Sequence, residues 1–135
     1  MTELQPVLPT EQERNLALLS HALSFVEGGV VAPLLLYIFR DQVQESFSKD
    51  GPKEASPFVA FHSLQSLYFG LMFVIISLPV AVATCGWGLF ITAPLYLVFE
   101  LIACIKAHAG LWYSLPIAGP LAARVHPPPW DARFE

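Results

Sequence analysis

The sequence predicts an all-α integral membrane protein, built as a bundle of three transmembrane helices with short interfacial helices. Hydrophobic residues make up 55% of the 135-residue chain and charged residues only 13%, about half the charged share of an average soluble domain. The segment 55–99 contains no Asp, Glu, Lys or Arg. A helix needs about 20 apolar residues to cross the hydrocarbon layer. This segment therefore accommodates two spans and a turn.

The predicted organisation is a single membrane domain at 13–121, between a loose N-terminal tail at 1–12 and a Pro-rich C-terminal tail at 122–135. The first span is expected at 15–39 as one long helix, in which Gly28-Gly29 allows a kink or a break. A polar connection follows it, and residues 42–47 of that connection are expected to form a short interfacial helix.

The second and third spans are expected at 63–83 and 87–105. An amphipathic lead-in at 57–62 precedes the second span, and the short turn at 84–86 forces the two spans into an antiparallel hairpin. The Pro-rich end of the chain is not a fourth span, because consecutive prolines favour an extended conformation.

The distribution of Lys and Arg predicts how three spans would be oriented. The N-terminal tail and the 84–86 turn would share one side and carry only Arg14. The other side would carry six cations, and Lys and Arg are enriched on the cytoplasmic side of membrane proteins. The N-terminus is therefore expected outside and the C-terminus in the cytoplasm. These six cations are Arg40, Lys49, Lys53, Lys106, Arg124 and Arg133.

Charge and spacing exclude several classes of function. The formal net charge is −4 without a basic block, so the cationic surface that nucleic-acid binding requires is not encoded. No Cys/His group has the spacing of a zinc site. No acid pair, nucleophile motif or phosphate-binding loop stands out either, so we expect no enzyme and no metal site.

Five polar residues within or beside the predicted spans form a candidate intramembrane site, because such residues are costly in lipid and often functional. Glu27 is the deepest acid, and its two interpretations are a proton or ion site and a protonated or water-exposed side chain beside Gly28-Gly29. Glu100 is interpreted as an interfacial anchor. The full set is His21, Glu27, His62, Gln65 and Glu100.

The two intramembrane histidines also allow a haem or a pigment, since imidazole is a common ligand. The favoured interpretation is structural: each imidazole would bond to a neighbouring helix, with His62 and Gln65 as an i, i+3 pair. No cofactor is therefore predicted.

Small and hydroxyl residues recur at helical spacing in all three predicted spans. Such residues let helices approach closely in lipid, where no hydrophobic force acts between them. They predict packing within the bundle or against a partner. The predicted packing residues are Gly28, Ala32, Ser66, Gly70, Gly88 and Thr92.

Several stretches resemble small bacterial membrane proteins of uncharacterised function, which are distantly related to the small membrane subunit of the chloroplast inner-envelope protein translocon. The resemblance begins at 13–21, is strongest at 58–67 with the His62-x-x-Gln65 pattern, and returns at 105–110 with the Lys106-Ala107-x-x-Gly110 pattern. It implies a helical bundle in a larger assembly of the bacterial inner (cytoplasmic) membrane.

Together these features predict a non-enzymatic, multi-pass accessory or scaffold subunit of an inner-membrane complex. Its expected partners are membrane lipids and other integral membrane proteins or further copies of itself, and no nucleic acid. One alternative is a homo-oligomeric, translocon-like pore or carrier component around Glu27. A second alternative is a bis-histidine haem or pigment protein that uses His21 and His62.

Overall fold

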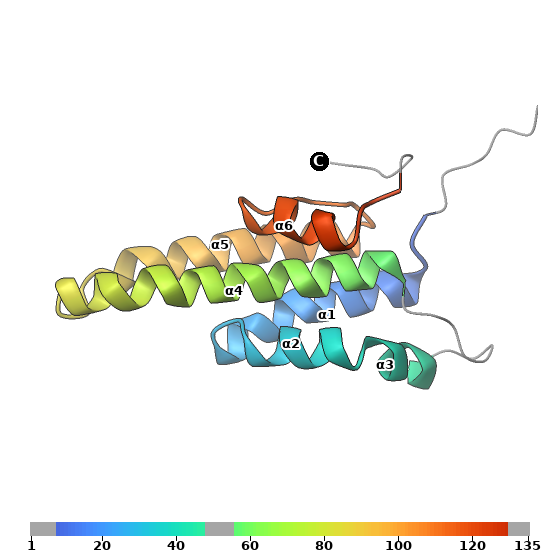
Figure 1. Ribbon diagram of the computed structural model, residues 1–135, viewed down its shortest axis with the longest axis horizontal. Coiled ribbons are helices and arrows are strands. Elements are labelled where there is room, and N and C mark those ends of the chain that lie inside the picture. The colour runs from blue at the N-terminus through green and yellow to red at the C-terminus, as the bar shows by residue number, and fades with distance from the viewer. Residues whose placement is uncertain (1–7, 48–55, 130–135) are drawn as a thin grey trace, which may run out of the picture.

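The computed structural model describes residues 8–47 and 56–129, and this part of the chain forms six α-helices. The predicted all-α class is confirmed for it. The long helices α4 and α5 lie side by side, and the shorter helices pack around one half of their length (Figure 1). The helices are α1 (Glu11–Glu27), α2 (Val31–Ile38), α3 (Arg40–Phe47), α4 (Pro57–Ala83), α5 (Leu89–His108) and α6 (Ala118–Val125).

Helix α1 begins with a capping box at Thr10. The Thr10 hydroxyl accepts from the Glu13 N–H at 3.3 Å, and the Glu13 carboxylate accepts from the Thr10 N–H at 2.6 Å. These two bonds satisfy amide groups that a helix start otherwise leaves free. They fix the point at which α1 enters the bundle.

The chain reverses direction between α1 and α2. Gly28 and Gly29 have φ values of +81° and +88°, a left-handed conformation that ends a right-handed helix. The Glu27 carboxylate accepts from the Ala32 N–H in the first turn of α2. Helix α2 therefore runs back beside α1 (Figure 1).

The prediction of one long helix at 15–39 is therefore wrong. Two left-handed glycines in succession fold this segment into a hairpin of 17- and 8-residue helices. Within the described residues, two helices are long and apolar enough to cross a membrane, α4 and α5. The three-span bundle becomes two candidate spans with a helical hairpin packed against them.

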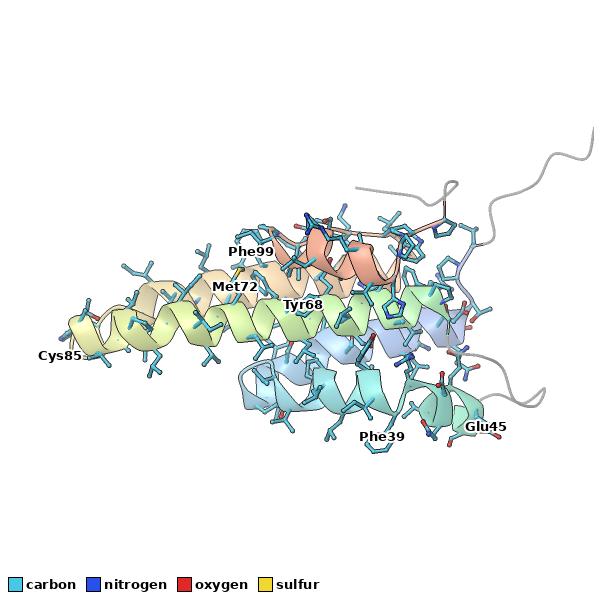
Figure 2. The ribbon with its side chains drawn as sticks, in the orientation of Figure 1. Phe39, Glu45, Tyr68, Met72, Cys85 and Phe99 are labelled. Carbon is cyan, nitrogen blue, oxygen red and sulfur yellow. The ribbon has the colours of Figure 1, made fainter. Side chains whose placement is uncertain are left out.

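Helix α4 joins the predicted lead-in and second span into one continuous helix of 27 residues. Ser56 caps its start, accepting from the Phe58 N–H at 3.2 Å, and Pro57 occupies the first turn, where no amide bond is lost. At the other end the Gly86 N–H donates to the Ala81 carbonyl at 2.7 Å, and the chain returns as α5. Figure 2 shows Cys85 at this turn, at the far end of the molecule from Glu45 on α3.

Helix α6 continues four residues into the stretch predicted as a Pro-rich tail, and it ends at Val125. It packs on α4, where Ala122 shares a core cluster with Phe58 and Phe61 of the first half of that helix. Aromatic residues fill the core there, and the Trp112 ring lies 5.3 Å from Phe58 and 5.2 Å from Phe61, between ring centroids.

The molecule divides into two regions along α4 and α5. We define the packed end as α1, α2, α3 and α6 with residues 57–70 and 96–108, and the hairpin arm as residues 71–95. Twelve of the fourteen residues at 57–70 are buried, whereas Ser77 alone is buried at 71–83. Most of the arm is therefore exposed in the described chain, and Met72 and Phe73, which are half-buried, pack against the adjoining core.

Candidate functional site

Three polar side chains from different helices meet in the packed end, and all three are fully buried. They are His21 of α1, His62 of α4 and Glu100 of α5. The His21 Nδ1 lies 2.7 Å from Glu100 Oε2, and the His21 Nε2 lies 3.1 Å from His62 Nδ1. The His62 Nε2 in turn lies 3.2 Å from the Leu111 carbonyl oxygen. The result is a linear chain of three hydrogen bonds, which we call the Glu–His–His cluster.

The sequence of α1 explains why His21 reaches this position. Ala17, Ser20, His21 and Ser24 are three or four residues apart and share one buried face. The small residues on this face leave room for α4 and α5 to approach. The imidazole thus lies between the two long helices.

Serine hydroxyls hold the backbone around the cluster. Ser66 Oγ donates to the Ser20 carbonyl at 3.2 Å and lies 3.5 Å from Glu100 Oε1. Ser20 and Ser24 donate to carbonyls one turn earlier in α1, those of Ala17 and His21. A hydroxyl has one hydrogen, so Ser66 links α4 to α1 chiefly through the shorter bond.

Aromatic rings shield the imidazole of His62. Its ring centroid lies 4.5 Å from Phe58 and 5.3 Å from Phe61, with an edge-to-face geometry in both cases. Apolar surroundings make an unpaired charge costly. Glu100 is therefore held as one member of a hydrogen-bonded pair, and it lies inside the bundle instead of anchoring α5 at an interface.

Gln65 lies near the cluster but bonds elsewhere. Its Oε1 accepts from the Leu115 N–H at 3.1 Å, which attaches the 109–117 loop to α4. It does not bond to His62, although the two residues are one turn apart.

Glu27 is separate from the cluster and exposed at the turn between α1 and α2.

Of the predicted packing residues, Gly70 makes the closest approach, because a Cβ there would lie 1.9 Å from the Gly29 carbonyl oxygen. Gly28 lies in the turn and Ala32 in the first turn of α2. Gly88 and Thr92 lie in the hairpin arm, where Thr92 Oγ1 donates to the Gly88 carbonyl at 3.3 Å.

The geometry also bears on ligand binding by the histidines. The direct bond between His21 and His62 leaves no space for a porphyrin between the rings. No three His, Cys, Asp or Glu side chains in the described part of the chain are placed to hold a metal ion. In the cluster, His21 lies between the other two residues, so the three do not converge on a common point.

Sequence reasoning identified the three side chains of the cluster but not their contact. It missed Ser20 and Ser24 and the acceptor at the Leu111 carbonyl. The three polar residues on one face of α1, Ser20, His21 and Ser24, were the signal that could have located the site, because their spacing predicts one buried stripe.

The sequence was compared with models of known protein families. Residues 12–122 match the model of the MamF/MmsF family, described as the magnetosome magnetite crystal formation protein family. No curated protein and no solved structure matches the chain. The predicted relationship to the chloroplast translocon subunit is wrong, because the family that covers most of the chain is a magnetosome family. The chain belongs to the MamF/MmsF family of magnetosome membrane proteins, which is involved in magnetite crystal formation.

Proposed function

We propose that this protein is a non-enzymatic accessory subunit of the magnetosome membrane that supports magnetite crystal formation by assembling with other membrane proteins. Membership of the family supports a role in magnetite crystal formation and a location in the magnetosome membrane. The observation that carries the assembly is the hairpin arm, whose large apolar side chains are exposed on both helices. Among them, Ile75, Val82, Phe90 and Ile91 are each at least 70% exposed.

Such a surface requires lipid or a protein partner, since soluble monomers rarely expose large continuous apolar patches. At 1.5 Å per residue, the 27 residues of α4 extend about 40 Å, more than the roughly 30 Å of the hydrocarbon layer. We propose that both α4 and α5 cross the membrane. The turn at 84–88 then lies on one side.

The packed end lies towards the other side and holds all four described Lys and Arg residues: Arg14, Arg40, Lys106 and Arg124. Arg14 lies beside Gly110, directly after the end of α5, with its Cδ 3.2 Å from a Cβ built on that glycine. The start of α1 and the end of α5 are thus at the same end. The excess of cations supports a cytoplasmic packed end and a turn inside the magnetosome, which replaces the expectation of an outside N-terminus.

The two cysteines provide a test of this orientation. Cys85 is exposed at the turn and Cys104 is buried. A membrane-impermeant thiol reagent should label Cys85 only after detergent opens intact magnetosomes, and Cys85→Ser should abolish that labelling. Full labelling of unopened magnetosomes would place the turn in the cytoplasm.

The accessory function is tested by deleting the gene in a magnetite-forming host. We expect smaller or fewer magnetite crystals by electron microscopy, restored by the wild-type gene, and co-migration with other membrane proteins after mild-detergent extraction. Normal crystals together with a lone monomer after extraction would exclude an accessory subunit.

A second candidate function is a homo-oligomeric pore or carrier component. It is favoured by the exposed acid Glu27, whose turn packs on α4 at Gly70, about halfway along that helix. An ion flux in liposomes that disappears with Glu27→Gln would support it. A flux that survives this substitution would exclude a role for the Glu27 carboxylate.

A further inference from the structure

We propose that the Glu–His–His cluster is a proton-transfer chain, in which one proton moves between Glu100 and His62 through His21 while the heavy atoms keep their positions. This inference rests on the three hydrogen bonds and does not depend on the accessory function.

The number of hydrogens in the cluster follows from its geometry. The Leu111 carbonyl can only accept, so the His62 Nε2 at 3.2 Å carries a hydrogen and donates it. The His62–His21 and His21–Glu100 contacts, at 3.1 and 2.7 Å, each require one further hydrogen. The two imidazoles and the carboxyl therefore share three hydrogens, which makes the cluster neutral overall.

Three arrangements satisfy this count with the same bonds. In the first, Glu100 is protonated and donates to His21 Nδ1, while both imidazoles are neutral. In the second, Glu100 is a carboxylate and His21 carries hydrogens on both nitrogens. In the third, His21 has passed its Nε2 hydrogen to His62 Nδ1, so that His62 is the cation and His21 Nδ1–H still donates to Glu100.

Each conversion breaks one bond and forms one along an existing hydrogen bond. The Glu100 O–H bond breaks as the His21 Nδ1–H bond forms, and then the His21 Nε2–H bond breaks as the His62 Nδ1–H bond forms. No side chain rotates and no other reactant is needed. The net effect moves one positive charge from the pair Glu100 and His21 to His62, beside the 109–117 loop.

The polar side chains next to the cluster are uncharged in their ordinary state. On α5, Tyr96 and Cys104 lie one turn on either side of Glu100, and both side chains are neutral in their ordinary state. On α1 and α4 the polar neighbours are hydroxyl groups, Ser20, Ser24 and Ser66, of which Ser66 lies 3.5 Å from Glu100 Oε1. These three hydroxyls donate to backbone carbonyls of α1, so they neither supply nor take up the proton of the cluster.

The test measures how hydrogens are distributed over the ring nitrogens, by 15N NMR of histidine-labelled protein in detergent. We expect fractional hydrogen occupancy at His21 Nδ1 and His62 Nδ1, with values that change on cooling. Complete occupancy or complete absence at every ring nitrogen, unchanged on cooling, would overturn the proposal, because the proton would then have one fixed position.

Two variants sharpen this measurement. In His62→Gln the amide can still donate to Leu111 and accept from His21 but cannot take up a proton, so hydrogen occupancy at His21 Nε2 should become complete. In Glu100→Gln the third hydrogen is lost, and both imidazoles should become fixed neutral rings. His108→Gln, in the last turn of α5 and outside the cluster, is the matched control and should leave the wild-type pattern unchanged. If His62→Gln leaves His21 as it is in the wild type, no proton passes between the two rings.

Discussion

The two halves of α4 and α5 have the same helical geometry but opposite surroundings. In the packed end, these helices bury an acid, a histidine and several hydroxyl groups against α1. In the hairpin arm they expose most of their large apolar side chains and bury only Ser77. Helix α5 also exposes Val98, Leu101 and Ile105 on its outer face in the packed end. Polar residues therefore lie inside the protein where several helices meet, and apolar residues lie outside where only two helices pack together.

This contrast follows from the environment of each region, which is protein for the inner faces of the packed end and lipid or a partner for the arm. In lipid no hydrophobic force drives helices together, so close packing and buried hydrogen bonds must do so. The packed end has close packing and buried hydrogen bonds, whereas the arm presents mostly apolar side chains to its surroundings. Substitutions in the packed end should therefore change the stability of the fold, whereas substitutions on the arm should change contact with lipid or a partner.

The largest effect is expected for Glu100→Ala. Removing one partner of a buried, hydrogen-bonded pair costs about 3–5 kcal/mol where the pair is ionised, because His21 would lose the hydrogen-bond partner at 2.7 Å that holds it between α4 and α5. The free energy of unfolding should be measured in the same detergent for both proteins. Ile75→Ala, at a side chain that is 70% exposed on the arm, is the control and should change it by less than about 0.5 kcal/mol. Equal losses for the two variants would contradict the division into two regions.

The next effect concerns close backbone approach. Gly70→Ala would place a methyl group 1.9 Å from the Gly29 carbonyl oxygen, which belongs to the backbone and cannot rotate away. Overpacking of this kind costs about 1–3 kcal/mol, and we expect the upper end of that range from unfolding measurements. In the arm, Gly88→Ala would meet the Val80 side chain at 2.3 Å, a neighbour that can move, so its loss should be smaller. A larger loss at Gly88 would show that the arm, and not the α1–α2 turn, limits stability.

The sequence was sufficient to predict α4 and α5, because long apolar runs without charges have few alternatives in a chain of this size. It was not sufficient to predict the path of residues 15–39. Gly28-Gly29 is compatible with a kink as well as with a full reversal, and the reversed path is the one that brings the Gly29 carbonyl against Gly70. Whether the chain kinks or reverses depends on tertiary contacts, and a hydropathy pattern carries no information about these.

The same limit applies to the site. The sequence showed that His21, His62 and Glu100 are costly in an apolar segment, but their positions 41 and 79 residues apart do not reveal that they meet. Treating 15–39 as one helix also put Glu27 at its centre and made that residue the leading candidate. The reversal at Gly28 moves Glu27 to an exposed turn and leaves His21 inside the bundle.

A smaller effect is expected for Gln65→Met, which keeps the volume of the side chain and removes its polar atoms. The buried Leu115 N–H would lose the acceptor that lies 3.1 Å away, and an unsatisfied buried amide costs about 1–3 kcal/mol. The loosened segment should be the 109–117 loop, so amide hydrogen exchange at Leu115 should rise while exchange in the arm stays constant. Faster exchange throughout α4 would indicate a general loss of structure instead.

The smallest effect should be a pH dependence at the contact between α2 and α6. The Tyr37 hydroxyl and His126 Nε2 form a hydrogen bond at 2.8 Å. A neutral imidazole with its hydrogen on Nδ1 accepts from the hydroxyl, whereas a protonated imidazole donates to it. Burial, and then the positive charge of Arg40, lowers the pKa of His126 below its ordinary value of 6.5. The unfolded chain therefore binds the proton more readily, and the contribution to stability is complete above pH 6.5 and decreases as the pH falls below it.

Melting temperatures of the wild type and of variants should be measured over a pH series that crosses 6.5. The comparison is needed because other groups also titrate on acidification, so the His126 contribution appears only as the difference between wild type and variant. The wild type should lose more on acidification than His126→Gln, whose amide cannot gain a charge beside Arg40. Tyr37→Phe removes the hydroxyl and keeps the ring, so it should lower the melting temperature through the lost hydrogen bond to His126. An equal acid-induced loss in the wild type and in His126→Gln would mean that the α2–α6 contact is insensitive to this proton. The pH dependence of the packed end would then arise from groups other than His126.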